Sequence, residues 1–273
     1  MVDATKFQFT GASVPLVYDE IMVPRLFTPW ALLLLNRLGL RRGERLLDVA
    51  CGPGTVARIA AERLGPKGRV LAIDISPPML AVAKSKPPIA DGAPIEYVES
   101  PAAPLAAPDR AFDVVTIQQG LQFFPDPAAA LTECRRALDR GGRVGIAVWS
   151  SIERCEVFFA LRAGLLETVP AELADLLLAP FSWPGAKALE TALRAAGFGS
   201  IQVEETALPL RFEGGAAQAT RLLEGSPLAP GFATLSAEVR AAFADAAKRR
   251  LAPLVQGGEV VGEMRSLIGI ATA

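Results

Sequence analysis

Apolar runs of strand length alternate with helix-like stretches over the middle of the chain. The strand-like runs are "RLLDVA" from residue 45, "RVLAID" from 69, "IEYVE" from 95, "FDVVTIQQ" from 112 and "GRVGIAVW" from 142. Stretches with helical patterning separate most of them, at 55–64, 77–85 and 126–139. Buried strands that alternate with helices are typical of a parallel sheet with helices on both faces. We therefore predict an α/β fold.

Helical patterning also precedes and interrupts this alternation. Residues 18–40 predict two helices, the second with Thr28 as its cap and Pro29 at its first position. Residues 152–180 are helical and lie outside the alternation, so we interpret them as an insertion that covers one edge of the sheet. The last helix and strand are expected near 233–252 and 263–271.

A glycine-rich turn follows the first strand, in "LLDVACGPGTVARIAAERL". A strand that runs through such a turn into a helix presents backbone N–H groups and a positive helix terminus to a ligand. Gly52 and Gly54 let the backbone approach that ligand, and Asp48 either orders the turn or meets a positive ligand group. Asp74 ends the next strand, where a carboxylate can accept both hydroxyls of a ribose. The spacing predicts a nucleoside site.

Two cofactor classes fit the glycines alone. Gly52, Gly54 and Ala57 also satisfy the dinucleotide fingerprint G-x-G-x-x-[GA], which keeps an NAD(P)-dependent oxidoreductase as an alternative. A hydride-transfer enzyme would need a relay set such as Tyr-x-x-x-Lys, and the sequence contains no such pair. This alternative is therefore the weaker one.

The stretch "DVACGPG" at 48–54 resembles the first motif of class I S-adenosylmethionine-dependent methyltransferases, D-x-[GA]-x-G-x-G. "VLAIDISPPMLAVAK" is similar to the second motif, and the chain from "FDVVTIQQ" to "GIAVW" is similar to the family's fourth and fifth strands. The resemblance covers about 15–215 and suggests the small-molecule subgroup that includes ubiquinone and menaquinone biosynthesis methyltransferases.

The resemblance implies a Rossmann-like, doubly wound, mainly parallel seven-stranded sheet with an antiparallel last strand. Residues 1–40 would form an N-terminal helical cover. Residues 41–273 would form the S-adenosylmethionine-binding methyltransferase domain, with a helical cap inserted at about 152–180. The implied cofactor is S-adenosyl-L-methionine.

The family's binding residues can be carried onto matching positions. Ala50, Gly52 and Gly54 would lie against the methionine part of the cofactor, with Asp48 beside the turn and Asp74 on the ribose. Ile75 and Met79 would flank the adenine. Gln118, at the end of the fourth strand, would also contact the cofactor.

One position departs from the family pattern. The family usually places an Asp after its third strand to bond the adenine amino group, and Pro101 stands there in this chain. The backbone N–H of Ala102 is the expected replacement contact, with Glu99 and Ser100 as alternatives. This departure, with the lack of an obvious base, motivates a second alternative: a non-methylating protein that keeps the fold and binds the cofactor.

Composition restricts the chemistry and the partners. The chain contains no histidine, which excludes an imidazole base, and its three cysteines form no close pair, so no metal site is predicted. With 28 basic and 29 acidic residues, nothing indicates a nucleic-acid or membrane partner. The start of the chain lacks a basic-then-apolar leader, and we expect a cytoplasmic monomer or homodimer.

The acceptor pocket is expected beyond the carboxyl ends of the fourth and fifth strands, where ligands of doubly wound sheets bind. The candidates there and on the N-terminal helices are Tyr18, Met22, Gln119, Gln122, Phe123 and Trp149. No catalytic residue is assigned, although Tyr18, Gln119 and Gln122 are candidates. We predict methylation of a small apolar or aromatic metabolite, at oxygen or carbon, by proximity and orientation without a histidine base.

Overall fold

One mixed sheet organises the computed structural model, which describes residues 14–226 and 228–273. The first residues of the expected N-terminal cover, 1–13, lie outside the described part. The sheet order is β3-β2-β1-β4-β5-β8-β6, with β7 paired to β8. The strands are β1 Arg45–Val49, β2 Arg69–Asp74, β3 Ile95–Glu99, β4 Phe112–Gln118, β5 Leu138–Trp149, β6 Gly199–Phe212, β7 Val255–Gln256 and β8 Glu259–Thr272.

The strand directions confirm the predicted fold class. Strands β1 to β5 pair in parallel, and β8 runs antiparallel to both β5 and β6. The last strand is thus the antiparallel one, and the short β7 adds a hairpin beside it. Leu46 and Leu47 are both fully buried in separate apolar clusters, because successive side chains of a strand point to opposite faces. Burial on both faces explains the continuous apolar runs of the sequence.

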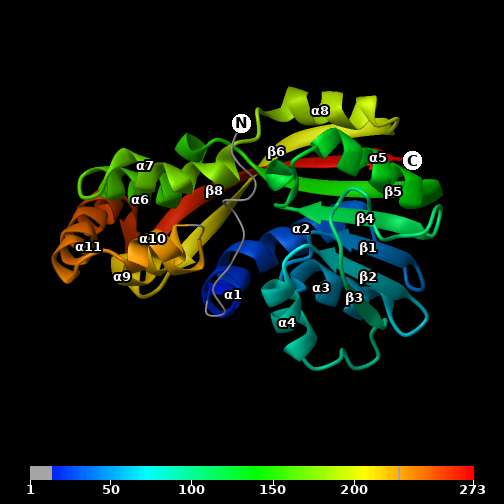
Figure 1. The fold of residues 1–273 in the computed structure, drawn as a ribbon, viewed down its shortest axis with the longest axis horizontal. Helices are drawn as coiled ribbons and strands as arrows, with labels where there is room; N and C mark the ends of the chain where they lie inside the picture. The colour runs from blue at the N-terminus through cyan, green and yellow to red at the C-terminus, as the bar shows by residue number, and fades with distance from the viewer. Residues whose placement is uncertain (1–13, 227) are drawn as a thin grey trace.

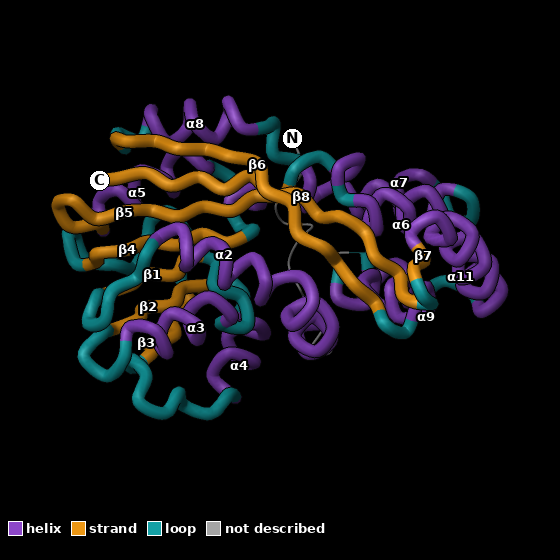
Figure 2. The backbone as a smooth tube through the Cα atoms, turned by 180° about the vertical axis from the view of Figure 1, so that it is seen from behind, coloured by secondary structure: helices purple, strands orange, loops and turns teal. Residues whose placement is uncertain are grey.

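Helices cover both faces of the sheet (Figure 1, Figure 2). Residues of α2 Thr28–Leu38 and α3 Thr55–Leu64 pack in one apolar cluster with Leu46, and residues of α5 Pro127–Ala137 and α8 Ala186–Ala195 pack in the other with Leu47. Helices α3, α5 and α4 Pro77–Ser85 begin and end close to the predicted bounds, and the short turn η3 Leu121–Phe123 follows β4.

The N-terminal helices form one continuous segment in place of the two separate helices expected. Its parts are α1 Val14–Val17, the π-helix η2 Tyr18–Phe27 and α2 Thr28–Leu38. The prediction of Thr28 as a cap is wrong: its backbone is helical, and its N–H donates to the carbonyl of Val23. Pro24 has no N–H, so a regular α-helical ladder cannot pass through this position. The wider π turns change which side chains share a face.

A helical lobe surrounds the far ends of β6 and β8 (Figure 1). Strand β8 pairs with β5 only as far as Ser266 opposite Trp149, whereas its pairing with β6 continues from Arg265 to Val260, where β7 joins it on the other side. The lobe, called the helical cap below, combines two stretches of chain: η4 Ile152–Arg154, α6 Glu156–Leu166, α7 Ala171–Ala174 and η5 Asp175–Phe181, then α9 Gly215–Thr220, η6 Arg221–Gly225, α10 Ala229–Ala233, α11 Ala237–Leu251 and η7 Ala252–Leu254.

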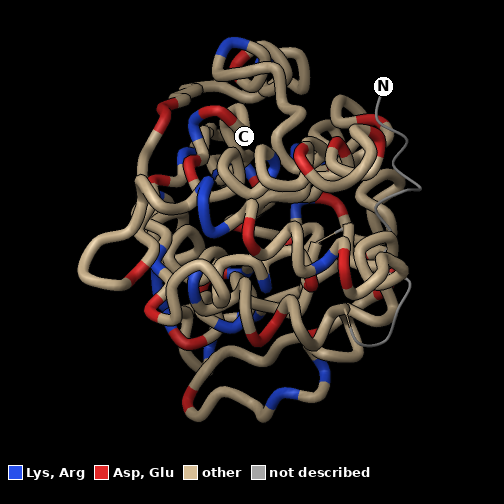
Figure 3. The backbone as a smooth tube through the Cα atoms, turned by 90° about the vertical axis from the view of Figure 1, so that its left-hand side faces the viewer, with Lys and Arg blue, Asp and Glu red and all other residues tan. Residues whose placement is uncertain are grey.

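Ion pairs join the strands at the edge where the parallel strands begin. Arg45 at the start of β1 binds Asp113 at the start of β4, with Nη2 and Oδ1 2.7 Å apart. Arg143 binds Glu44 at 2.9 Å. Acidic and basic residues are interspersed along the backbone (Figure 3). Within residues 14–226 and 228–273, no helix combines the length and the apolar character needed to cross a bilayer.

Phe212 tests the role of the ribbon formed by β6 and β8. Its side chain is fully buried in the apolar cluster that continues into the helical cap. We expect Phe212→Ala to lower the free energy of unfolding by about 3–5 kcal/mol, because it removes a large buried ring and leaves a cavity. Val255→Ala, at a 47% exposed position, should change it by about 0.5 kcal/mol or less. Urea unfolding measures both, and equal effects would contradict this account.

Candidate functional site

The turn after β1 is held in left-handed backbone conformations. Ala50, Gly52 and Gly54 have φ values of 57°, 53° and 82°. A Cβ atom on Gly54 would lie 2.6 Å from the Tyr97 hydroxyl oxygen, so glycine is required there by both conformation and space. The turn leads directly into α3, whose first N–H groups have no partner within the helix. The predicted strand, turn and helix are therefore all present.

Asp74 at the end of β2 organises this turn. Its Oδ2 accepts a hydrogen bond from the Gly52 N–H at 2.7 Å, and its Oδ1 accepts one from the Ser76 N–H at 2.8 Å. Burial raises the pKa of Asp74 above its ordinary value, and these backbone donors oppose that rise. Each carboxylate oxygen can accept more than one hydrogen bond, so the group retains capacity for ligand hydroxyls.

Asp48 is the more deeply buried carboxyl of the pair. Its Oδ2 accepts from the Ala57 N–H at 3.1 Å, and its Oδ1 accepts from the Thr116 hydroxyl at 2.8 Å. Burial raises its pKa to about 7. A small cavity of about 30 Å³ adjoins it, lined also by Thr55 and Val56 at the start of α3. The Asp48 carboxyl thus holds the turn in place and borders this small cavity.

A cavity of about 740 Å³ opens beyond the carboxyl ends of the parallel strands. The structure brings most of the predicted site residues to its wall: Tyr18, Met22, Ala50, Gly52, Asp74, Ile75, Met79, Ala102, Gln118, Gln119, Phe123 and Trp149. Asp48, Gly54 and Gln122 do not line it. Asp48 and Gly54 lie in or under the turn, and the side chain of Gln122 donates to the Gln119 carbonyl at 3.0 Å.

The loop after β3 meets the cavity without an acidic side chain. Ser100, Pro101 and Ala102 line the wall, whereas Glu99 does not. The Ser100 hydroxyl is already bonded within the loop, since it donates to the Pro101 carbonyl at 3.0 Å and accepts from the Ala106 N–H at 3.1 Å. The Ala102 backbone remains the position for the predicted adenine contact.

The π-helix covers the turn and supplies one wall. Tyr18, Met22 and Phe27 all line the cavity, and the rings of Tyr18 and Phe27 stack with centroids 4.8 Å apart. Gln118 Nε2 donates to the Phe27 carbonyl at 2.8 Å. Lys86 Nζ reaches both Asp19, at 2.6 Å, and the Pro53 carbonyl of the turn, at 2.8 Å. These bonds hold the π-helix above the glycine-rich turn that follows β1.

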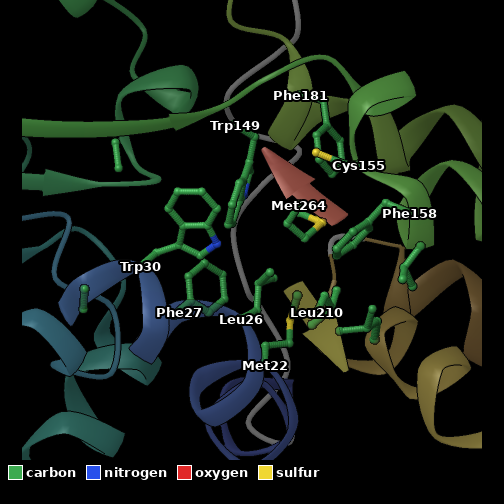
Figure 4. Packing of buried hydrophobic residues seen from close by; sticks show 14 of the residues in the cluster. Met22, Leu26, Phe27, Trp30, Trp149, Cys155, Phe158, Phe181, Leu210 and Met264 are labelled. Carbon is green, nitrogen blue, oxygen red and sulfur yellow. The ribbon is translucent and has the colours of Figure 1, made fainter. Parts of the chain in front are cut away.

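The helical cap supplies a wall that the sequence analysis did not assign residue by residue. Phe158 and Phe181 line the cavity from the first cap stretch, with ring centroids 5.2 Å apart, and face Trp149 across the packed interior in Figure 4. Gly225 and Ser226 line it from the second stretch. A Cβ on Gly225 would lie 2.9 Å from Met22 Sδ, so the cap and the π-helix meet closely. Helical patterning marked the first stretch in the sequence, whereas the segment around Gly225 was not predicted.

The cavity wall is poor in charge. Among its described lining residues the ionisable groups are Tyr18, Asp74 and Asp126, and none is a Lys or Arg. Burial raises the pKa of Tyr18 well above its ordinary value, and Asp74 and Asp19 add to this rise. The Tyr18 hydroxyl therefore keeps its proton at neutral pH. The described residues contain no cluster of three or more metal-ligating side chains.

Comparisons with known proteins agree with this arrangement. Residues 13–210 match the model of the ubiE/COQ5 methyltransferase family. The chain is 37% identical to nocamycin O-methyltransferase of Saccharothrix syringae over 71% of this chain and 73% of that protein. It is 31% identical to demethylmenaquinone methyltransferase of Staphylococcus aureus over 64% of this chain and 76% of that protein.

A solved structure has the same fold at lower sequence identity. It is phosphoethanolamine N-methyltransferase 2 of Haemonchus contortus, in complex with phosphomonomethylethanolamine and S-adenosylhomocysteine. The match has a TM-score of 0.61 and 20% identity, and it covers 100% of this chain and 60% of that one.

The raised pKa of Asp48 makes stability depend on pH. In the unfolded chain the carboxyl returns to an ordinary pKa near 3.8, against about 7 in the fold. The folded state therefore binds more protons between these values, and the free energy of unfolding falls as the pH rises from about 4 to 7, by about 4 kcal/mol in total.

Asp48→Asn isolates this effect. The amide can still accept from Thr116 but presents an N–H₂ group to the Ala57 N–H, so we expect the variant to be less stable than the wild type at pH 5. The amide does not titrate, so the deficit should shrink or reverse at pH 8. Urea unfolding at both pH values measures it, and a deficit independent of pH would refute the assignment.

Proposed function

The chain belongs to the ubiE/COQ5 methyltransferase family, and we propose that it transfers the methyl group of S-adenosylmethionine to a small, uncharged, apolar or aromatic acceptor. The observation that carries this proposal is one continuous cavity with two unlike ends. One end holds the glycine turn and Asp74, and the other is walled by aromatic side chains of the helical cap.

The residues at the first end fit the cofactor. Gly52 lies in the left-handed turn, and Asp74 retains acceptor capacity for ribose hydroxyls while lining the cavity. Ile75, Met79 and Ala102 line the same cavity, which supports the proposal that the first two flank the adenine and that the Ala102 backbone contacts its edge. When bound, the cofactor supplies a methyl group on a positively charged sulfur.

The second end restricts the acceptor. Phe158, Phe181 and Trp149 give it apolar walls. A phosphate or carboxylate there would be buried without a cationic partner among the described lining residues, which costs several kcal/mol. Uncharged ring compounds pay little of this free-energy cost when they pack against such a wall. The proposed acceptor is therefore apolar or aromatic and carries no anionic group.

The proposed rate enhancement comes from proximity and orientation. Holding the acceptor atom in line with the transferred carbon and its leaving sulfur removes much of the entropic barrier. Tyr18 keeps its proton and can orient either ligand, and no histidine is available to act as base. Oxygen and acidic carbon are the proposed acceptor atoms. The name of one relative, an O-methyltransferase, supports oxygen as the acceptor atom.

The proposal extends to the setting of the enzyme. Cys51, Cys134 and Cys155 are free and buried, which supports a reducing, cytoplasmic compartment. The interspersed charges support a small-molecule acceptor rather than nucleic acid or a membrane, and the protein would act as a monomer or homodimer. We assign residues 1–40 to the N-terminal cover and 41–273 to the methyltransferase domain, with the cap inserted at about 152–180 and joined by the helices after β6.

Calorimetry with S-adenosylmethionine, S-adenosylhomocysteine and NAD tests the cofactor end. We expect both sulfur nucleosides to bind and NAD not to bind. Asp74→Ala should weaken their binding about 100-fold, because charge-assisted hydrogen bonds to the ribose and the anchor of Gly52 are lost together. Asp126→Ser, which keeps a helix-capping oxygen, should change it less than about threefold. Binding of NAD alone would refute the proposed function.

Transfer of labelled methyl groups tests the acceptor end. Because the wall offers no cation, we expect label to enter 1-naphthol but not 4-hydroxy-1-naphthoic acid, which keeps the free hydroxyl and adds a carboxylate. Substituting Phe158→Arg should weaken this discrimination by giving the carboxylate a partner. Equal labelling of the neutral and anionic compounds by the wild type would contradict the proposed acceptor class.

A further inference from the structure

Gln119 holds an unusual backbone conformation at the centre of the cavity wall. It follows β4 directly and has a φ of 55°, in the left-handed region that residues with a side chain seldom adopt. Its N–H donates to the Ala147 carbonyl at 2.8 Å, which keeps the residue on the sheet. The next residue is Gly120, where a Cβ would lie 2.7 Å from the Ala50 Cβ. Such strain persists where the surrounding structure enforces it, often at functional sites.

A buried hydrogen-bond chain fixes the orientation of its amide. Ser266 is fully buried, and its hydroxyl donates to the Val148 carbonyl at 2.8 Å. With its proton committed, Ser266 Oγ acts as acceptor for Gln119 Nε2 at 3.1 Å. The amide oxygen diverges from the nitrogen at Cδ, so Oε1 faces away from Ser266. The side chain is thus held in one of its two possible orientations.

The side-chain oxygen itself has no hydrogen-bond partner among the described residues. Gln119 is 6% exposed and lines the cavity, and Oε1 is buried. A buried acceptor without a partner costs about 1–3 kcal/mol. Tertiary packing therefore keeps an oriented acceptor oxygen on a residue that lines the cavity, at a cost that a hydrogen bond from a ligand would relieve.

We propose that Gln119 determines acceptor specificity: its Oε1 accepts a hydrogen bond from a hydroxyl group of the methyl acceptor. The proposal rests on the proposed function, since it places the acceptor in the same cavity. Trp149 and Phe123 line the wall beside it and can hold the ring that carries the hydroxyl. The substrate class is then a hydroxylated ring compound, such as a phenol or quinol, rather than any apolar molecule that fits.

A pair of matched ligands tests the hydrogen bond. The protein saturated with S-adenosylhomocysteine is titrated by calorimetry with 1-naphthol and with 1-methylnaphthalene, in which a methyl group replaces the hydroxyl. The measured quantity is the ratio of the two dissociation constants. We expect Gln119→Met to shift this ratio about tenfold against 1-naphthol, which corresponds to about 1.4 kcal/mol. Methionine has similar length and meets the same backbone strain, but it lacks the acceptor oxygen.

Two further variants keep the test decisive. Ser266→Ala leaves Gln119 in place but removes the partner of its amide nitrogen, so the ratio should shift in the same direction by a smaller factor. Gln202→Met, at an exposed position on β6, should leave the ratio unchanged. An unchanged ratio in both Gln119→Met and Ser266→Ala, or failure of 1-naphthol to bind, overturns the proposal. Failure of the wild type to bind S-adenosylhomocysteine would instead count against the proposed function.

Discussion

The long ribbon formed by β6 and β8 is the constraint on which the cavity depends. Its pairing runs without a break from Gln202 opposite Ile270 to Phe212 opposite Val260. From Thr272 back to Ser266, β8 is also hydrogen-bonded to β5, whereas from Arg265 back to Glu259 it is not. The same two strands therefore belong to the sheet at one end and to the helical cap at the other. This continuity places the aromatic cap residues over the carboxyl ends of the parallel strands.

The apolar core follows the ribbon across this transition. Trp30 and Trp149 meet edge to face with ring centroids 5.5 Å apart on the sheet side. Phe158, which is labelled in Figure 4, belongs to the same buried cluster on the cap side as Phe212 and Phe243. Burial of these rings stabilises the cap. Trp149 and Phe158 also line the cavity, so two of the rings that hold the cap in place belong to the wall of the proposed acceptor end.

The sequence predicted best what depends on neighbours along the chain. The strands, the turn at Gly52 and the helix after it follow from local apolar patterning and from glycine conformation. Asp74 was predicted as a ribose ligand, and its hydrogen bond to the Gly52 N–H was missed because it joins two separate strands. The resemblance to a known family supplied the antiparallel direction of the last strand, which local patterning alone does not determine, and no strand order was predicted.

The sequence predicted less well what depends on distant contacts. The short turn Leu121–Phe123 brings Phe123 to the wall but directs the Gln122 side chain to the Gln119 backbone, and spacing alone did not separate the two. The π-helix needs Pro24 together with the packing around it. The residues after β6 join the cap only because the ribbon carries them beside α6, and local patterning does not reveal this. The contact is close: a Cβ added to Gly164 of α6 would lie 3.1 Å from the backbone nitrogen of Ala247.

The two ends of the cavity are encoded in different parts of the gene. The proposed cofactor end is drawn from the turn at Gly52 and the strand end at Asp74, whereas the proposed acceptor end is drawn largely from the cap around Phe158 and Gly225. With this division, mutations in the cap would reshape the acceptor wall while leaving the cofactor end intact. A lineage with this architecture can acquire new acceptors without first losing its methyl donor.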